Sequence, residues 1–212
     1  YAKPVGVVAA IAPSTNPAAT PVNKAMMALK GANAVIVAPS PAGANTTTKT
    51  VDYMRDELEK IGLPADLVQV LPQPVNKALT QTLMEAADLV VVTGSQNNVR
   101  RAYSSGTPAI GVGAGNVSVI IDSGADLKDA ADKITQSKIF DNATSCSSEN
   151  ALIILEDVYD AALEALKDAG GYLATAEEKD KIQATLWVGG HLNRKVIAKD
   201  AAVFAAEAGL EG

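Results

Sequence analysis

Residues 5–17 read VGVVAAIAPSTNP, an apolar run that ends in a short polar segment. Comparable β-branched runs recur along the chain, each followed by an amphipathic stretch. They are Val5–Ile11, Ala34–Val37, Leu67–Val70, Leu89–Thr93 and Ala109–Val112. Because these runs are apolar nearly throughout, they are typical of strands buried on both faces of a sheet. The alternation of such strands with helices predicts the α/β class, with a doubly wound parallel sheet.

Two stretches between the predicted strands have the periodicity of helices that cover a sheet. Ala18–Lys30 and Thr46–Ile61 each place apolar residues on one stripe. Near Gly115 the order changes to a strand, a helix, a polar loop, a strand and a helix, so we predict two domains, residues 1–115 and residues 116–212. The chain begins inside an apolar run without an initiator Met. This indicates a segment of a longer protein, in which the first domain is incomplete at its N-terminus and the second at its C-terminus.

The composition argues against several classes of protein. No apolar run approaches the roughly 20 residues that a membrane helix needs. Against 24 acidic residues the chain has 18 Lys and Arg, a net charge of −6, and they form no basic cluster of the kind that binds nucleic acid. One cysteine and one histidine, Cys146 and His191, exclude an internal disulfide and a metal cluster of these residue types. We therefore predict a protein of a reducing compartment, the cytoplasm, with no metal and with neither nucleic acid nor membrane as partner.

Polar or glycine-rich segments follow three predicted strands, at the edge of an open α/β sheet where ligands bind. Residues 12–17 would offer the N–H groups of a helix start to an anion, or would form only a turn. Residues 93–97 would let a phosphate approach Gly94, or would use Ser95 only as a helix cap. Residues 111–116 hold three glycines, which suit a flat ligand or a turn between domains. The residues alone leave these alternatives open, and no G-x-G-x-x-G motif follows the first strand.

Cys146 lies in the segment FDNATSCSSEN, residues 140–150. A lone cysteine is most often a small buried apolar residue. The surrounding Asp, Asn, Thr and Ser side chains instead predict a polar loop in which the thiol is partly exposed and its thiolate can act as a nucleophile. His191 is a natural base for such a thiol, but it lies far along the chain in a glycine-flanked segment, and we assign it a surface or cap role.

Taken in order, four segments resemble the CoA-acylating branch of the aldehyde dehydrogenase superfamily. They are GVVAAIAPSTNP (residues 6–17), TGS (residues 93–95), AYSSGTPAIGVGAGN (residues 102–116) and FDNATSCSSE (residues 140–149). The resemblance is to acylating acetaldehyde, succinate-semialdehyde and sulfoacetaldehyde dehydrogenases and to the aldehyde dehydrogenase half of bifunctional aldehyde-alcohol dehydrogenases. It covers Pro4 to about Tyr172 and weakens beyond Thr175. It implies a Rossmann-like cofactor domain, the start of a second α/β domain that is catalytic, and a homo-oligomer.

The resemblance also implies a reaction and a role for particular residues. Cys146 matches the catalytic nucleophile, and Asn16 matches the amide that stabilises the oxyanion. The family oxidises an aldehyde to an acyl-CoA through a thioester, with NAD or NADP as cofactor and CoA as co-substrate. The residues implied at the dinucleotide are Ser14, Thr15, Ser40, Thr93, Gly94, Ser95, Gly113, Ala114, Gly115 and Asn116.

Two departures from the hydrolytic aldehyde dehydrogenases bear on the reaction. Those enzymes activate water with a Glu in a Glu-Leu-Gly-Gly segment, where this chain has residues 111–114, which include no base. A thioester without that base survives longer and can pass to a thiol. Residues 38–42 have neither the Lys that many hydrolytic relatives place beside the ribose nor an acidic residue that selects against a 2′-phosphate. The choice between NAD and NADP stays open, as do a hydrolytic or phosphate-dependent semialdehyde dehydrogenase and an inactive cofactor-binding or assembly module.

Overall fold

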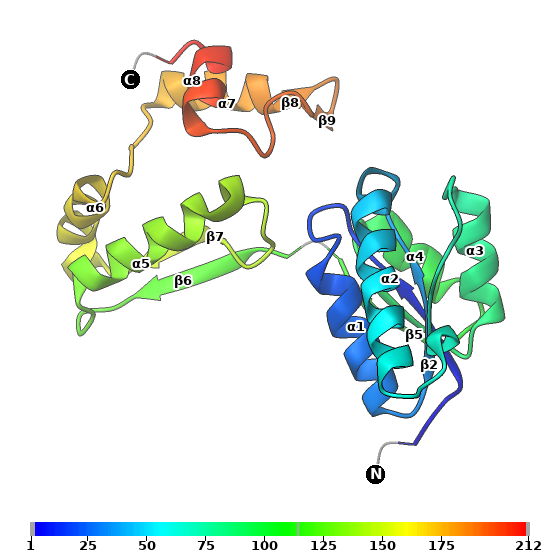
Figure 1. Cartoon of the computed structure of the whole chain (residues 1–212). Helices are drawn as coiled ribbons and strands as arrows, with labels where there is room; N and C mark the ends of the chain where they lie inside the picture. Colours follow the sequence, from blue (N-terminus) through cyan, green and yellow to red (C-terminus); the bar gives the residue numbers. More distant parts are fainter. Residues whose placement is uncertain (1–2, 114, 211–212) are drawn as a thin grey trace. The chain divides into compact units, whose positions relative to one another are not determined.

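The computed structural model describes residues 3–113 and 115–210, and the chain divides into two compact units, Tyr1–Ala114 and Gly115–Gly212 (Figure 1). In the first unit, parallel strands form one sheet in the order β3-β2-β1-β4-β5. They are β1 (Val7–Ile11), β2 (Ala34–Ala38), β3 (Val68–Val70), β4 (Leu89–Thr93) and β5 (Ala109–Val112). The strand order reverses between β1 and β4, as it does in doubly wound folds. The predicted α/β class and parallel sheet are confirmed.

Helices cover both faces of this sheet (Figure 1). They are α1 (Ala19–Lys30), α2 (Ala44–Lys60), α3 (Lys77–Ala86) and α4 (Gln96–Tyr103), with short 3-10 turns η1 (Pro41–Gly43) and η2 (Ala65–Leu67) before α2 and β3. One buried cluster packs Ala25 and Val51, from α1 and α2, against the sheet. A second packs Met84 and Val99, from α3 and α4, against it. Burial of each such Val or Met side chain stabilises the fold by about 1.5–3 kcal/mol, so the two clusters hold the strands in place.

The start of β1 is held by two polar side chains from neighbouring segments. The Asn33 side-chain oxygen accepts hydrogen bonds from the N–H groups of Val5 and Gly6, at 2.6 Å and 3.0 Å. The Asp88 carboxylate accepts one from the Val7 N–H, at 2.8 Å. These bonds satisfy backbone donors that would otherwise need a sheet partner. The strand therefore begins at Val7, two residues later than the apolar run predicts.

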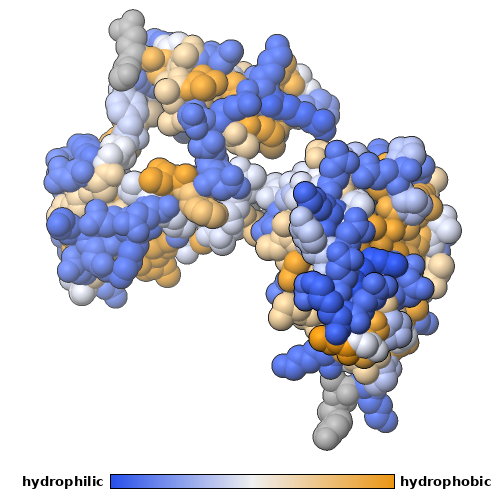
Figure 2. All heavy atoms as spheres, in the orientation of Figure 1, coloured by the Kyte–Doolittle hydropathy of each residue, from blue (hydrophilic) through white to orange (hydrophobic). Residues whose placement is uncertain are grey.

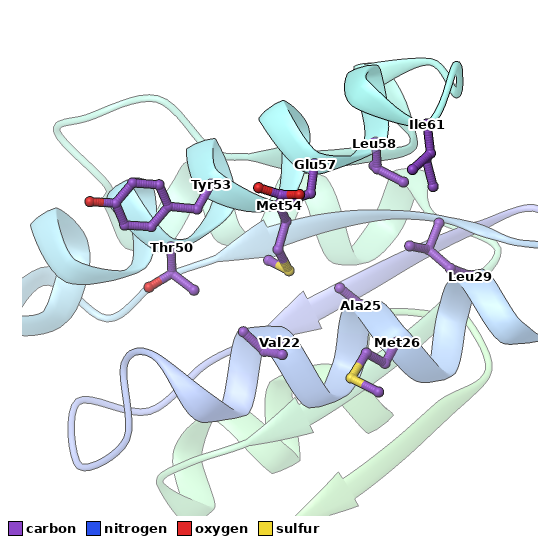
Figure 3. A pocket seen from close by; sticks show the side chains of 10 residues that line it. All are labelled: Val22, Ala25, Met26, Leu29, Thr50, Tyr53, Met54, Glu57, Leu58 and Ile61. Atoms are coloured by element: carbon purple, nitrogen blue, oxygen red, sulfur yellow. The ribbon is translucent and has the colours of Figure 1, made fainter.

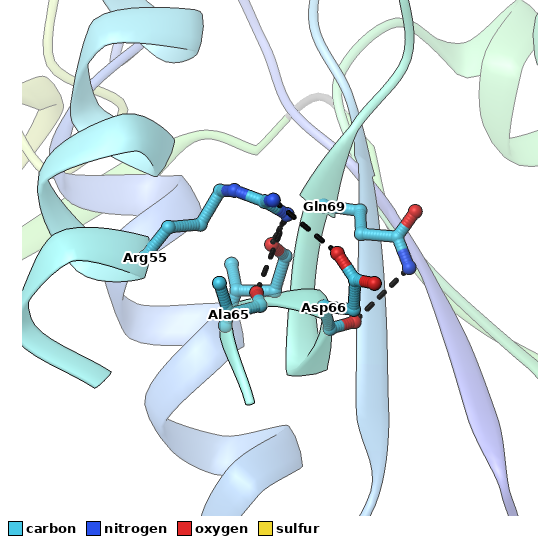
Figure 4. Close-up of polar contacts among 5 residues, drawn as sticks. Arg55, Ala65, Asp66 and Gln69 are labelled. Carbon is cyan, nitrogen blue, oxygen red and sulfur yellow. Dashed lines mark hydrogen bonds and ion pairs between the residues drawn. The ribbon is translucent and has the colours of Figure 1, made fainter. Parts of the chain in front are cut away.

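Arg55 on α2 ties the edge strand β3 to the body of the first unit (Figure 4). Its guanidinium donates hydrogen bonds to the carbonyl oxygens of Ala65 and Val68, at 3.3 Å and 3.1 Å, and to the Asp66 carboxylate at 3.2 Å. The Asp66 side chain is 80% exposed, so the ion pair itself contributes little to stability. The two carbonyl bonds fix the turn that leads into β3.

The second unit begins with a two-stranded parallel sheet of β6 (Val117–Ile121) and β7 (Glu149–Ile154). Between them lie α5 (Leu127–Ile139) and the 3-10 turn η3 (Phe140–Ala143), and η4 (Glu156–Val158) and α6 (Tyr159–Asp168) follow. The Asp126 carboxylate caps α5 by accepting a hydrogen bond from the Asp129 N–H at 3.1 Å. The segment between η3 and β7 contains the cysteine.

The rest of the second unit consists of α7 (Ala176–Leu186), β8 (Trp187–Val188), β9 (His191–Leu192) and α8 (Ala201–Ala208). Gly189 and Gly190 join β8 to β9 with φ angles of 58° and 76°, the left-handed backbone that a two-residue hairpin turn requires. The glycine pair is therefore a hairpin turn, and His191 is exposed beside it. No helix among residues 3–113 and 115–210 is long and apolar enough to cross a bilayer.

Candidate active site

Cys146 occupies the tip of a four-residue turn, Ser145–Ser148. The Ser148 N–H donates a hydrogen bond to the Ser145 carbonyl oxygen at 3.2 Å, which closes the turn. The hydroxyls of Ser145 and Ser147 lie 2.8 Å apart and bond to each other across Cys146. Ser148 is buried, with 2% of its surface exposed, whereas the free thiol of Cys146 is exposed. The buried Ser148 thus holds the turn in place, and the exposed Cys146 is open to solvent.

The backbone that enters this turn has an unusual conformation. Asp141, Asn142 and Ala143 have φ angles of 50°, 51° and 56°. Asp and Asn tolerate left-handed backbone, but for Ala it costs about 1–2 kcal/mol. Costly backbone of this kind persists where the surroundings impose it, and it clusters at functional sites. The turn therefore follows a backbone segment that is strained at Ala143, a feature that the sequence analysis does not predict.

The exposed thiol of Cys146 is expected to react with reagents in the folded protein. We expect Cys146 of the folded protein to react with one equivalent of a thiol reagent such as 5,5′-dithiobis-(2-nitrobenzoic acid) without denaturant, because its sulfur is exposed. Absorbance of the released thiolate measures the reaction. Cys146→Ser, which keeps the size and shape of the side chain, gives the background. Labelling that appears only after unfolding would contradict the exposed turn.

Glu149 directly follows the thiol turn, and the sequence analysis assigns it no role. Hydrogen bonding to the Ser137 side chain and then to its own backbone N–H holds the pKa of Glu149 below its ordinary value, although desolvation opposes this shift. Its second carboxylate oxygen, Oε2, is buried without a hydrogen-bond partner among the described residues. Glu149 is therefore ionised near neutral pH and places a negative charge at the foot of the turn.

Asn16 lies in the exposed loop between β1 and α1. Its side-chain oxygen Oδ1 accepts a hydrogen bond from the Ala19 N–H at 3.1 Å, which satisfies a donor in the first turn of α1. This bond uses the oxygen of the amide group and not its nitrogen Nδ2. Among the described residues, this nitrogen donates to no acceptor. Asn16 thus presents two N–H donors at the end of β1, as an oxyanion site requires.

The register of the sheet brings the other predicted site residues of the first unit to one edge. Ile11 pairs with Val92, and Thr93 pairs with Val112, so the carboxyl ends of β1, β4 and β5 are adjacent. The residues at these ends are Ser14, Thr15, Asn16, Thr93, Gly94, Ser95 and Gly113. Ser40 follows β2 at the same edge. Gly115 and Asn116 belong to the second unit, and Ala114 lies outside the described residues.

Local contacts at this edge show how the loops are held. The Ser95 hydroxyl caps α4 by accepting a hydrogen bond from the Asn98 N–H at 3.3 Å, and the Ser40 hydroxyl caps η1 by accepting one from the Gly43 N–H at 3.2 Å. Ser95 is therefore a helix cap in this structure, and approach of a phosphate to residues 93–97 stays a prediction. A Cβ on Gly113 would lie 2.7 Å from the amide end of the flexible Gln96 side chain, so a larger residue at position 113 would require Gln96 to change its conformation.

The donor set at this edge fits the phosphates of a dinucleotide. The loops after β1 and β4, residues 12–18 and residues 94–95, contain hydroxyl and amide side chains and no carboxylate. The α4 N-terminus adds the positive end of a helix dipole. Ser14 and Thr15 are exposed and Thr93 is half-buried, so their hydroxyls are available to a ligand. Binding of NAD(P) by these residues stays a prediction.

An apolar groove lies outside this site, and no metal-binding group was found among the described residues. An apolar groove of about 490 Å³ runs between α1 and α2 (Figure 3). It is lined by Met26, Tyr53, Met54 and their neighbours and by none of the predicted site residues. Figure 2 shows hydrophobic residues interspersed with hydrophilic ones on one face of the molecule. Within the described residues, no group of three or more His, Cys, Asp or Glu side chains is arranged to hold a metal ion.

The sheet order and the polar edge define a Rossmann-like α/β protein. The model of the aldehyde dehydrogenase family matches residues 1–204, and the chain belongs to this family. The predicted family resemblance is thereby confirmed.

Relatives within the family point to its acylating members. The chain is 57% identical over 210 residues to the acylating sulfoacetaldehyde dehydrogenase of Cupriavidus necator, a match that covers 99% of this chain and 43% of that protein. A crystal structure of an acetylating aldehyde dehydrogenase from Geobacillus thermoglucosidasius is 40% identical with a TM-score of 0.92, over 99% of this chain and 47% of the other. An engineered glycolyl-CoA reductase with bound NADP+ is 28% identical with a TM-score of 0.89, over 99% and 48%. The chain thus spans less than half the length of each of these relatives.

Proposed function

We propose that this chain forms part of a CoA-acylating aldehyde dehydrogenase, which oxidises an aldehyde with NAD(P)+ and CoA to an acyl-CoA through a thioester on Cys146. The observation that carries the proposal is the exposed thiol at the tip of the Ser145–Ser148 turn in a chain of the aldehyde dehydrogenase family. A thiolate fixed in this way can attack an electrophilic carbonyl carbon. In this proposal the first unit binds the dinucleotide and the second begins the catalytic domain.

Each step of the proposed reaction uses a named group of this chain. The Cys146 thiolate adds to the aldehyde carbon, and the carbonyl oxygen becomes an oxyanion. The Asn16 side-chain nitrogen donates a hydrogen bond to that oxygen, which stabilises the charge that develops in the transition state. The oxyanion collapses to a thioester as the aldehyde hydrogen departs with its electron pair. The CoA thiolate then adds to the thioester carbon, and Cys146 leaves as a thiolate.

NAD(P)+ supplies the acceptor for this hydride when it is bound. In the proposal its phosphates are held by the hydroxyls of Ser14, Thr15 and Thr93 and by the α4 N-terminus at Gly94 and Ser95. The relative with bound NADP+ supports a dinucleotide at this fold. Ser40 is proposed to lie near the ribose, and Gly113–Asn116 near the nicotinamide.

Two observations support CoA, rather than water, as the acceptor of the acyl group: a missing base and the names of the relatives. Water needs a general base to attack a thioester at a useful rate, whereas a thiol ionises more readily and is the better nucleophile. Residues 111–113 at the end of β5 contribute no carboxylate. The relatives named as acylating or acetylating support transfer to CoA.

CoA dependence tests the proposal directly. In the native protein that carries this chain, we expect NAD(P)H formation from an aldehyde to require CoA and to yield acyl-CoA in equal amount. Absorbance at the NAD(P)H band measures the first product and chromatography the second, over a panel of neutral and anionic aldehydes that includes acetaldehyde and sulfoacetaldehyde. Free carboxylic acid formed at an undiminished rate without CoA would establish the hydrolytic alternative.

A further inference from the structure

Lys24 is buried in the first unit without a charged partner. It lies on α1 with 5% of its surface exposed, and the buried polar side chains in the part of the chain that the structure describes are Lys24, Thr47 and Ser148. Its ammonium nitrogen Nζ donates hydrogen bonds to the carbonyl oxygens of Ile11 at 2.6 Å and Val91 at 2.8 Å. Backbone dipoles therefore take the place of a counter-ion.

These two carbonyl groups lie at the place where the strand order reverses. Ile11 is the last residue of β1 and Val91 is the central residue of β4, and the two strands pair directly. Ligands of open α/β sheets bind in the crevice at this position. The chain that leaves β1 forms the loop with Asn16, and the chain that leaves β4 forms the Gly94–Ser95 segment. A single side chain thus joins the two strands whose loops carry the proposed cofactor and oxyanion groups.

The elements around Lys24 offer it no titratable partner. The strands β1, β2 and β4 read VVAAI, AVIVA and LVVVT. The residues of α2 that are buried against the sheet are Ala44, Thr47, Val51 and Leu58. On α2, the partly exposed Arg55 bonds to Asp66 instead. Tyr53 and Glu57 of α2 line the groove beside α1, but both are exposed, and the Glu57 carboxylate accepts a hydrogen bond from Lys60. On α1 itself the other titratable side chain is Lys30, which is exposed. Desolvation is therefore the cause that lowers the pKa of Lys24 to about 7.

The loop between β1 and α1 is also held from its other end. The Thr47 hydroxyl of α2 donates a hydrogen bond to the Pro17 carbonyl oxygen at 2.7 Å. Lys24 thus bonds to the start of the segment that carries Asn16, and Thr47 bonds to its end. A neutral hydroxyl is sufficient at the far end. At the near end the chain uses a lysine, although burial of an unpaired charge is costly and an apolar side chain would avoid that cost. A role for the charge explains this choice.

We propose that Lys24 is a positioning residue of the dinucleotide site, which joins the end of β1 to β4 and places a positive charge beneath the loops that bind the cofactor phosphates. This inference rests on the proposed function, because it needs a dinucleotide at that edge. A neutral amine still has two N–H groups and can keep both carbonyl bonds. Deprotonation of Lys24 therefore removes the charge and leaves the geometry.

The pH dependence has opposite signs for cofactor binding and for stability. Above a pKa of about 7 the folded protein loses the positive charge, so affinity for the anionic cofactor falls as the pH rises. Unfolded Lys keeps its proton up to its ordinary pKa of about 10.4. Between these two values the unfolded state binds more protons than the folded state, so the contribution of Lys24 to stability rises with pH. A purely structural lysine would produce the second trend without the first.

The test measures the dissociation constants of NADH and NADPH between pH 6 and pH 9, by fluorescence, in the native protein that carries this chain. If a bound phosphate raises the pKa of Lys24 by about one unit, affinity falls about tenfold across this range. Lys24→Arg, which stays charged, should bind without this pH dependence, and Lys24→Met should bind weakly at every pH. Lys30→Met, which removes an exposed charge from the same helix, should behave as wild type.

Three results would overturn the inference. One is wild-type affinity that does not change with pH, and another is the same pH profile in Lys24→Arg. The third is Lys24→Met that binds as wild type and differs only in its melting temperature. If Lys24→Met does not fold, the wild-type and Lys24→Arg profiles decide. Absence of dinucleotide binding in the wild type at every pH would instead remove the proposed function itself, and this inference with it.

Discussion

Cys146→Ala is expected to abolish CoA-dependent NAD(P)H formation in the native protein that carries this chain. The thiolate forms the covalent bond to the aldehyde carbon, and no other group of the chain is a thiol. Loss of a nucleophile in covalent catalysis reduces turnover by at least about 10⁴-fold. Initial rates at saturating aldehyde, CoA and cofactor measure the effect. The exposed position of Cys146 means that its truncation leaves no buried cavity, so the variant should fold normally.

A matched variant separates the chemistry of the sulfur from the shape of the turn. Cys146→Ser keeps the size of the side chain and the Ser145–Ser148 turn, but its hydroxyl stays protonated at neutral pH. We expect it to be as inactive as Cys146→Ala while both still bind NAD(P)H. Mass spectrometry after incubation with an acyl-CoA should show an acyl adduct on the wild type and on neither variant. Turnover that persists in both variants would place the nucleophile at another residue.

Substitution of Asn16 is expected to give the second largest loss. Asn16→Ala removes the proposed oxyanion donor, and removal of one such donor lowers kcat by about 10²–10³-fold. It also removes the acceptor for the Ala19 N–H. The same change therefore destabilises the start of α1, and a loss of activity alone would not identify the donor.

Asn16→Asp resolves this ambiguity. A carboxylate keeps the acceptor for the Ala19 N–H, and Asp at a helix start is as stabilising as Asn, but it has no N–H to donate and repels an oxyanion. We expect Asn16→Asp to retain the melting temperature of the wild type and, at saturating cofactor, to lose kcat at least as strongly as Asn16→Ala. If Asn16→Asp turns over at the wild-type rate, the oxyanion is stabilised by other donors.

The positions of the first-unit strands follow closely from the sequence because burial of apolar side chains dominates their formation. Runs such as Val90–Val92 have no polar residue, and a strand buried on both faces is the way to remove them from water. The bounds of helix α3 were not predicted, since its cap at Asn76 and its buried Leu83 and Met84 give a weaker signal than the strands on either side. Where a polar side chain competes with the sheet, as Asn33 does at Val5, the strand is shorter than its apolar run.

Some features of the candidate site are likewise predictable from the sequence, and others are not. The polar edge and the exposure of Cys146 follow from residue types and their order along the chain. The left-handed backbone at Asp141–Ala143 does not, because Asp and Asn tolerate this conformation without requiring it and Ala disfavours it. Lys24 lies inside α1 and Lys30 at its end, and the burial of Lys24 depends on tertiary contacts with Ile11 and Val91 that the sequence does not reveal.

The thiol turn has a further consequence, for oxidation. An exposed cysteine is open to peroxide, and its sulfenic acid is normally rescued when a second thiol condenses with it to a disulfide. This chain has no second cysteine, so Cys146 has no resolving partner within it. A thiol from outside this chain must take that role, and CoA, which in the proposed reaction already approaches this sulfur, is suited to protect it as a mixed disulfide.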